Sequence, residues 1–288
     1  MFDTPDQATE FVDFWNEILA EKFITWRHIL VDGLAHHSAT VLPALEVHEG
    51  DRIVDIACGF GDTAIALAQS TGPTGNVLGI DCCQAFLDLA EADAAAAGVD
   101  NVEFVAADAQ SFEFLPEYDF CFTRFGAMYF ANPVMGFKVM RSALKPGGRM
   151  TAIVWRDLED NPWLYLSKQI ILDYLPEPGA DARTCGPGPF SMANEAVVRR
   201  QLEIAGYSDI EFERVDAPIL IGRDAEEAVR FQLAIGPAGE VFREAGDEAE
   251  EQRDVIATAM TRELARYRTD EGIVMDSSSW RITARNPG

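Results

Sequence analysis

The chain contains little lysine, few histidines and no long apolar run. Lysine occurs four times against nineteen arginines, and 48 acidic residues outweigh 23 basic ones for a formal charge of −25. Such a negative field repels phosphate backbones and anionic lipids. No stretch reaches the roughly 18 apolar residues of a membrane-spanning helix, and the acidic start MFDTPDQATE lacks the basic region of a signal peptide. We therefore expect a cytoplasmic protein with neither nucleic-acid nor membrane partners.

The number and spacing of the cysteines also indicate neither a metal site nor disulfides. The five cysteines are odd in number and include no CxxC pair. Four of them fall in or beside expected strands, where a reduced thiol behaves as a small hydrophobe. No metal site is expected.

The hydrophobic pattern alternates between short strands and helices. With 288 residues the chain can form one large α/β domain with insertions. Strands are expected at about 52–57, 76–80, 102–106, 118–123 and 149–155, and helices at about 61–70, 83–97 and 132–144. Strict alternation of this kind predicts a parallel, doubly wound sheet of the Rossmann-like type.

A glycine turn between the first strand and the first of these helices predicts a nucleotide cradle. The segment Val54-Asp55-Ile56-Ala57-Cys58-Gly59-Phe60-Gly61 ends an apolar strand and opens a helix. Glycines let the backbone approach a ligand, and the helix start offers free N–H groups. Asp81 lies twenty residues beyond Gly61 and closes the second strand, where a carboxylate can accept both ribose hydroxyls. The glycine spacing alone fits both a nicotinamide-dependent enzyme and a methyltransferase.

Further residues at the strand ends narrow the choice. Asp55 can reach the turn and a bound amino group, and Asp108 follows the third strand, where it can accept from an adenine amine. Lys145-Pro146-Gly147-Gly148 is expected to end a helix and lead into the fifth strand. Together the segments VDIACGFG, GID, AAD and LKPGG resemble the class I S-adenosylmethionine-dependent methyltransferases in order and spacing.

This resemblance implies a seven-stranded sheet whose last strand is antiparallel and lies between the fifth and the sixth. It also implies S-adenosylmethionine as cofactor. The residues expected to bind it are Trp26, Asp55, Ala57, Gly59, Gly61, Asp81, Cys82, Asp108, Ala109 and Arg124.

Shorter phrases resemble a bacterial branch of small-molecule enzymes related to ubiquinone/menaquinone C-methyltransferases. They are Phe14-Trp15-Asn16 with Trp26, the run 123–130, Trp155-Arg156, Asn161-Pro162-Trp163, 186–190 and Ile235-Gly236-Pro237. The branch implies a small, hydrophobic or aromatic acceptor, with an oxygen, nitrogen or carbon nucleophile. An NAD-dependent oxidoreductase and a non-catalytic S-adenosylmethionine-binding protein remain alternatives.

Four regions follow from the elements and the Pro/Gly punctuation. Residues 1–48 are expected to form a helical cover of two helices, 49–156 the cofactor-binding core, 157–192 a lid insertion, and 193–288 the rest of the core. The last region is expected to contain a helix at 193–205, strands at 209–216 and 278–284, and a helical insertion at 222–268. The acidic stretch 240–254 within it is expected to be a solvated helix face. A homodimer is compatible with the sequence.

Methyl transfer needs positioning more than it needs a catalytic side chain, so candidate bases are weakly indicated. They are His28, His37 and Tyr129, with a packing role favoured for His37 and Tyr129. Arg124 can pair with the methionine carboxylate, or structurally with Asp119 or Asp157. Trp15 and Trp26 can cover the sulfonium through cation–π contact.

Overall fold

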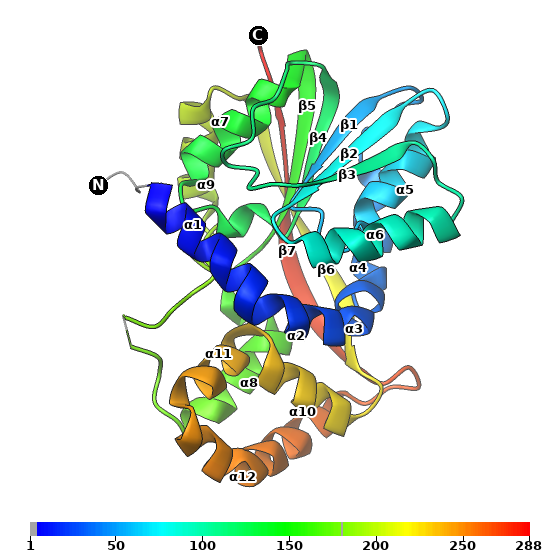
Figure 1. The fold of residues 1–288 in the computed structure, drawn as a ribbon. Helices are drawn as coiled ribbons and strands as arrows, with labels where there is room; N and C mark the ends of the chain where they lie inside the picture. Colours follow the sequence, from blue (N-terminus) through cyan, green and yellow to red (C-terminus); the bar gives the residue numbers. More distant parts are fainter. Residues whose placement is uncertain (1–4, 180) are drawn as a thin grey trace.

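The computed structural model describes residues 5–179 and 181–288, so the first four residues of the expected acidic N-terminus lie outside the described residues. A seven-stranded sheet with strand order β3-β2-β1-β4-β5-β7-β6 forms the centre of the molecule (Figure 1). Its strands are β1 (Arg52–Ile56), β2 (Asn76–Asp81), β3 (Val102–Ala106), β4 (Tyr118–Arg124), β5 (Leu144–Trp155), β6 (Ser208–Gly222) and β7 (Ile273–Arg285). The first five pair in parallel, and β7 runs antiparallel between β5 and β6. The expected fold class is confirmed.

Four helices pack on the two faces of this sheet: α5 (Asp62–Thr71), α6 (Gln84–Ala96), α7 (Pro133–Ala143) and α9 (Glu195–Ala205). The side chain of Asn132 accepts from the Met135 N–H and starts α7, which has proline at its first position. Asn194 starts α9 in the same way.

The segment 145–148 does not end a helix as expected. α7 ends at Ala143, and these residues already belong to β5. The Gly147 N–H donates to the Asn286 carbonyl at 2.7 Å, and the Asn286 N–H donates to the Gly148 carbonyl at 2.9 Å. Gly147 has φ +80, a conformation that glycine adopts at little cost. The glycine pair therefore joins the sheet to the C-terminal end of the chain.

The last two strands extend well beyond the expected limits and carry a helical cap. The cap consists of α8 (Pro162–Leu172) from the expected lid together with α10 (Ala225–Ala234), α11 (Gly236–Ala245) and α12 (Asp247–Leu264). Figure 1 shows these helices gathered at one end of β6 and β7. Ile171 of α8, Phe242 of α11 and Ile256 of α12 are buried in one apolar cluster. The lid helix and the helical insertion thus pack together.

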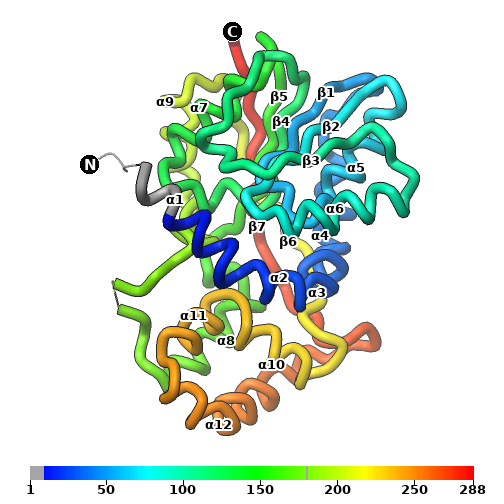
Figure 2. The backbone as a smooth tube through the Cα atoms, viewed as in Figure 1, coloured from blue at the N-terminus to red at the C-terminus, as the bar shows by residue number. Residues whose placement is uncertain are grey.

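The N-terminal region forms a bent helical arm rather than two helices. It consists of α1 (Pro5–Phe14), a π-helical turn (Trp15–Leu19), α2 (Ala20–Thr25), α3 (Arg27–Asp32) and α4 (Ala35–Val41). The bend at Gly33 lies against β6, where the Leu220 N–H donates to the Gly33 carbonyl. A Cβ atom at Gly33 would lie 2.2 Å from the Leu220 oxygen, so only glycine fits there. In Figure 2 the arm runs between the sheet and the cap.

Short 3-10 turns complete the described chain, at Leu42–Ala44, Ala127–Tyr129, Leu158–Asp160 and Ala265–Tyr267. Within the described ranges, no helix combines the length and apolarity needed to cross a membrane.

Candidate functional site

A cavity of about 470 Å³ extends from the glycine turn to the cap. The parallel strands supply its floor at their carboxyl ends, where ligands of open α/β sheets bind. Trp15 and Phe23 of the arm and Phe231 of the cap supply walls on the other sides. Most of the lining is apolar, so a ligand enclosed here is shielded from water.

The two glycines of the turn have different surroundings. Gly59 has φ +56 and lines the cavity, and a Cβ atom built on it meets nothing within 4 Å. Gly61 has φ +74 and does not line the cavity; a Cβ atom there would lie 2.6 Å from the Ala90 Cβ and 2.9 Å from the Phe104 ring. Gly59 therefore leaves room for a ligand, whereas Gly61 lets α5 begin close to α6 and β3.

Asp81 fastens this turn to the end of β2. One carboxylate oxygen accepts from the Gly59 N–H and the other from the Cys83 N–H, each at 2.9 Å. Burial raises the pKa of Asp81 to about 6. Each carboxylate oxygen can accept a second hydrogen bond, so two ligand hydroxyls can still be held. Cys82 lies beside it in the cavity lining, and burial raises the pKa of its thiol.

Asp55 lies behind the turn rather than in the cavity lining. It is fully buried, and one of its oxygens accepts from the Thr63 hydroxyl at 2.6 Å. Its other oxygen has no partner within the described part of the chain. Burial outweighs the Thr63 hydrogen bond and raises the pKa of Asp55 to about 7. Since Thr63 does line the cavity, the carboxylate of Asp55 can stabilise a positively charged group of a ligand through the Thr63 hydroxyl.

Asp108 and Ala109 follow β3 and line the cavity, as does Ala57 after β1. One oxygen of Asp108 accepts from the Gln110 N–H at 2.9 Å, which fixes the side chain at the start of its own turn. The geometry leaves its second oxygen available to a ligand.

Arg124 lines the cavity at the end of β4, but its structural partner is Asp62 at the start of α5, at 2.6 Å. It also donates to the Ser38 hydroxyl. The alternative pairings with Asp119 and Asp157 are wrong; Asp119 instead pairs with Lys145 at 2.7 Å. A ligand carboxylate would have to share Arg124 with Asp62.

Like Gly61 and Asp55, three more residues expected at the site do not line the cavity: Trp26, His28 and His37. Trp26 packs against Phe231, with ring centroids 5.7 Å apart, and stacks on His28. His28 in turn faces Glu227, with the Nε2 and Oε1 atoms 3.2 Å apart. The arm breaks at Trp26, which turns this ring toward the cap. Trp15 occupies the cavity wall instead.

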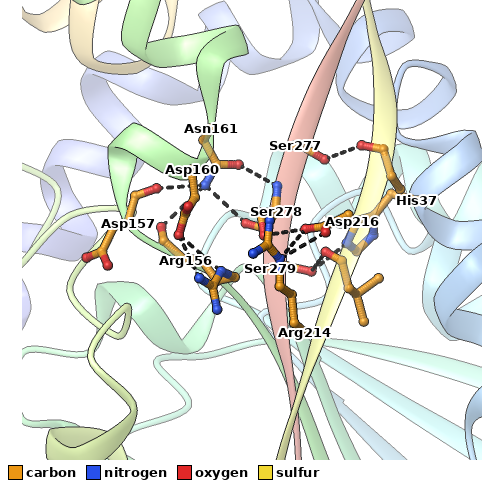
Figure 3. Close-up of polar contacts among 12 residues, drawn as sticks. His37, Arg156, Asp157, Asp160, Asn161, Arg214, Asp216, Ser277, Ser278 and Ser279 are labelled. Atoms are coloured by element: carbon orange, nitrogen blue, oxygen red, sulfur yellow. Dashed lines mark hydrogen bonds and ion pairs between the residues drawn. The ribbon is translucent and has the colours of Figure 1, made fainter.

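His37 is completely buried beside β7, where its Nε2 lies 2.9 Å from the Ser279 hydroxyl (Figure 3). Burial and the nearby charge of Arg124 lower the pKa of His37 to about 3. The imidazole is therefore a weak base that does not line the cavity. Of the three weakly indicated bases, Tyr129 alone lines it.

A polar network where the chain leaves the sheet for the cap was missed by sequence reasoning (Figure 3). The buried Asn161 amide donates to the carbonyls of Asp157 and Ser278, both at 3.0 Å, and its oxygen accepts from the Ser278 N–H. The adjacent Trp163 also donates to Asn161 and lines the cavity. The phrase Asn161-Pro162-Trp163 is a signal in the sequence, but its partner strand could not be inferred from it.

Glu240 is a second residue of the cavity that could not be recognised from the sequence. Its position at the start of the acidic stretch 240–254 predicted a solvated side chain, yet it lines the cavity and pairs with Arg243. Only the contacts of α11 with the core reveal this.

Known proteins share both the motifs and the fold. Residues 53–148 match a family model described as a methyltransferase domain. The demethylmenaquinone methyltransferase of Staphylococcus aureus (strain JH9) is 32% identical over 114 residues, which is 39% of this chain and 46% of that protein. The chain thus matches about half the length of this curated relative.

Three solved structures share the fold at low sequence identity. A putative methyltransferase from Bacillus halodurans C-125 is 18% identical, with 87% of this chain and 98% of that chain covered and a TM-score of 0.56. The Haemonchus contortus phosphoethanolamine N-methyltransferase 2, in complex with S-adenosyl-L-methionine, is 17% identical and has a TM-score of 0.58. The match covers 96% of this chain and 60% of that chain. The [4+2]-cyclase SpnF is 16% identical and has a TM-score of 0.51, and the match covers 87% of this chain and 80% of that chain.

The residues of the turn fit the cofactor of this family. Gly59 leaves open space where any side chain would intrude, and Asp81 retains acceptor capacity at the end of β2. Residues 53–148 therefore form a methyltransferase domain similar to part of the demethylmenaquinone methyltransferase, and the turn has room for S-adenosylmethionine as its cofactor.

Proposed function

We propose that the protein transfers the methyl group of S-adenosylmethionine to a small, uncharged and largely apolar acceptor. The observation that supports this most directly is the continuous cavity from Gly59 to the cap helices. Its two basic lining residues are already paired, Arg124 with Asp62 and Lys168 with Glu177. An anionic acceptor would find no unpaired cation among the described lining residues.

The bound cofactor would supply an electrophilic methyl group on a positively charged sulfur. The residues of the chain itself would bind the two reactants and enclose them. Gly59 would let the backbone approach the cofactor, Asp81 and Asp108 would accept from its hydroxyls and adenine amine, and Trp15 would exclude water from one side. Holding two reactants in line is worth on the order of 7 to 11 kcal/mol. A neutral acceptor that gains the methyl group also loses a proton, which would pass to water or to a basic group at the cavity.

The two alternative functions receive no comparable support. A dinucleotide-binding sheet of the usual type has six parallel strands, whereas here antiparallel β7 separates β5 from β6. SpnF, which shares the fold, is a cyclase, so the fold alone does not specify methyl transfer. The cytoplasmic location and the homodimer stay predictions.

Calorimetry followed by a transfer assay tests the proposal. The protein should bind S-adenosylmethionine and S-adenosylhomocysteine but not NAD. Radiolabel from the cofactor's methyl group should then pass to some members of a panel of neutral aromatic acceptors. Tight cofactor binding without transfer to any acceptor would favour a non-catalytic binding protein, and preference for NAD would refute the assignment.

A further inference from the structure

Backbone strain is concentrated at the floor of the cavity. The first residue after each parallel strand from β1 to β4 lines the cavity: Ala57, Cys82, Ala107 and Phe125. Two of these four have a positive φ, +54 at Ala57 and +60 at Phe125. Glycines aside, the part of the chain that the structure describes has one other such residue, Asp209, at an irregularity where β6 begins. Alanine and phenylalanine adopt this left-handed conformation at a cost in free energy, because the Cβ atom crowds the backbone.

The two strained residues meet through Gly126. Their strands, β1 and β4, are neighbours at the middle of the sheet, where ligands of open α/β sheets bind. A Cβ atom on Gly126 would lie 2.3 Å from the Ala57 Cβ, while φ at Gly126 is −100 and suits any residue. Glycine is therefore needed at this position to make room for the Ala57 methyl group and not for its own backbone. The methyl group fills the space between the two turns.

The turn at Phe125 brings its ring to the end of β5. The Phe125 N–H donates to the Ile153 carbonyl at 2.8 Å, so the backbone is still paired with the sheet where φ becomes positive. The ring stacks on Trp155, with centroids 3.7 Å apart and planes 11° from parallel. The buried His37 ring packs against both, with centroids 5.2 Å from Phe125 and 5.8 Å from Trp155. These contacts fix the orientation of a ring that lines the cavity.

The strained pair lies between the two ends of the cavity. Ala57 is two residues before Gly59 of the glycine turn, where the cofactor would bind. Trp155, on which Phe125 stacks, contacts Trp163 at the start of the cap, with centroids 5.5 Å apart. A methyl group that passes from the cofactor to an acceptor at the cap end therefore crosses the floor at Ala57 and Phe125. The methyl group of a sulfonium is apolar and shares its positive charge, which the face of an aromatic ring attracts.

We infer that Ala57 and Phe125 are positioning residues that shape the cavity floor under the transferred methyl group, and that their strained backbones are retained for this contact rather than for stability. Strained conformations persist where the surrounding structure enforces them, and they cluster at binding and active sites. The Ala57 methyl group sets how closely the cofactor approaches the sheet, and the face of the Phe125 ring meets the charged sulfonium group. The inference rests on the proposed function, because it concerns the group that is transferred.

Melting curves of the ligand-free protein test the strain. Phe125→Gly and Phe125→Ala both remove the ring and differ in how well they tolerate a positive φ, so we expect the glycine variant to melt at the higher temperature. Ala57→Gly should melt about 2 to 4 °C above Ala107→Gly, the matched control after β3, where φ is not positive. Equal melting temperatures within each pair would contradict the idea that these two positions are strained.

Calorimetry with S-adenosylmethionine and S-adenosylhomocysteine tests the contact, because the two ligands differ only in the methyl group and its charge. Phe125→Leu keeps an apolar side chain but lacks an aromatic face, so it should weaken binding of S-adenosylmethionine relative to S-adenosylhomocysteine about threefold to tenfold. Phe125→Tyr keeps the aromatic face and should keep the original ratio, whereas Ala57→Gly should change the ratio in the same direction as Phe125→Leu. Phe114→Leu is the control, since Phe114 packs against Phe112 outside the cavity lining.

Two results would overturn the inference. In one, Phe125→Leu and Ala57→Gly change the affinities for both ligands equally, which would mean that these residues only support the general shape of the site. In the other, Phe125→Tyr loses as much preference for S-adenosylmethionine as Phe125→Leu, which would mean that the aromatic face makes no contact with the sulfonium group. Either result leaves the proposed methyl transfer standing as long as the unmodified protein binds both ligands. Failure of the unmodified protein to bind S-adenosylmethionine would contradict the proposed function instead.

Discussion

Replacing Asp81 with asparagine separates the charge of this residue from its shape. In the structure its two oxygens accept from the N–H groups of Gly59 and Cys83. Asparagine keeps one acceptor and presents a donor to the other N–H. We expect the variant to fold, with a slightly loosened glycine turn, and to bind the cofactor much more weakly.

The magnitude follows from the hydrogen bonds lost and from the raised pKa. Two ribose hydroxyls without their charged acceptor cost about 2 to 4 kcal/mol at pH 7, or roughly 30- to 1,000-fold in affinity. Burial raises the pKa of Asp81 to about 6, so the carboxylate is mostly ionised at pH 7 and mostly protonated at pH 5. The advantage of the unmodified protein over Asp81→Asn should therefore shrink about tenfold between pH 7 and pH 5.

Titration calorimetry with S-adenosylhomocysteine at pH 5, 6 and 7 measures this, with melting curves to show that each sample is folded. Glu103→Gln on β3 serves as control, because Glu103 is an exposed carboxylate outside the cavity lining. The reasoning is refuted if Asp81→Asn binds as tightly as the unmodified protein at pH 7. It also fails if the ratio of the two affinities does not change with pH.

Four other predictions concern the turn, the buried carboxylate, the cap and the arm. Gly59→Ala should weaken cofactor binding and lower the free energy of unfolding by about 1 to 2 kcal/mol. Gly61→Ala should lower the free energy of unfolding by about 2 to 4 kcal/mol, because its methyl group clashes with the core. Equal effects of the two variants in calorimetry and urea unfolding would contradict this. Burial raises the pKa of Asp55 to about 7, so between about pH 4 and pH 7 the folded apo protein retains a proton that the unfolded chain releases. The free energy of unfolding should therefore fall as the pH rises through this range. Asp55→Asn should make this pH dependence less steep, and an unchanged slope would argue against the assignment. Asn161→Ala should cost about 2 to 4 kcal/mol in urea unfolding, and a neutral result would mean that the network of Figure 3 contributes no net stability. S-adenosylhomocysteine should slow hydrogen exchange in the arm, and Trp15→Ala should reduce methyl transfer more than stability; protection limited to the glycine turn would leave the arm a structural appendage.

The part of the site built from local geometry could be predicted from the sequence. A strand, a glycine turn and a helix are consecutive in the chain, so the places of Gly59 and Asp81 follow from their spacing. The antiparallel last strand was expected only from the resemblance, because periodicity does not reveal strand direction. The different surroundings of Gly61 depend on Ala90 and Phe104, which are distant in sequence.

The cavity walls depend on how distant segments pack, and there the sequence was less informative. Trp15 and Trp26 belong to the same aromatic stretch, and the break in the arm at Trp26 decides which ring meets the cavity. Glu240 looks like one of many surface carboxylates until α11 is seen against the core. β6 continues through the apolar residues 217–222 and β7 begins at Ile273, and these added lengths are revealed by the pairing of the two strands with each other.

The last strand connects the sheet to the cap. Near the middle of β7 lies Ser278, whose N–H and carbonyl both bond to the side-chain amide of Asn161 at the start of the cap. Asn161 therefore ties α8 to the sheet, and α8 packs against α11, where a Cβ atom on Gly236 would lie 2.8 Å from Leu164. Glu240 is one helical turn further along α11. The distance between the glycine turn and Glu240 is thus set by a chain of fixed contacts rather than by a flexible linker. A change in the length of β6 and β7 would move the acceptor end of the cavity and leave the cofactor end in place, which is how one cofactor fold can accommodate different reactions.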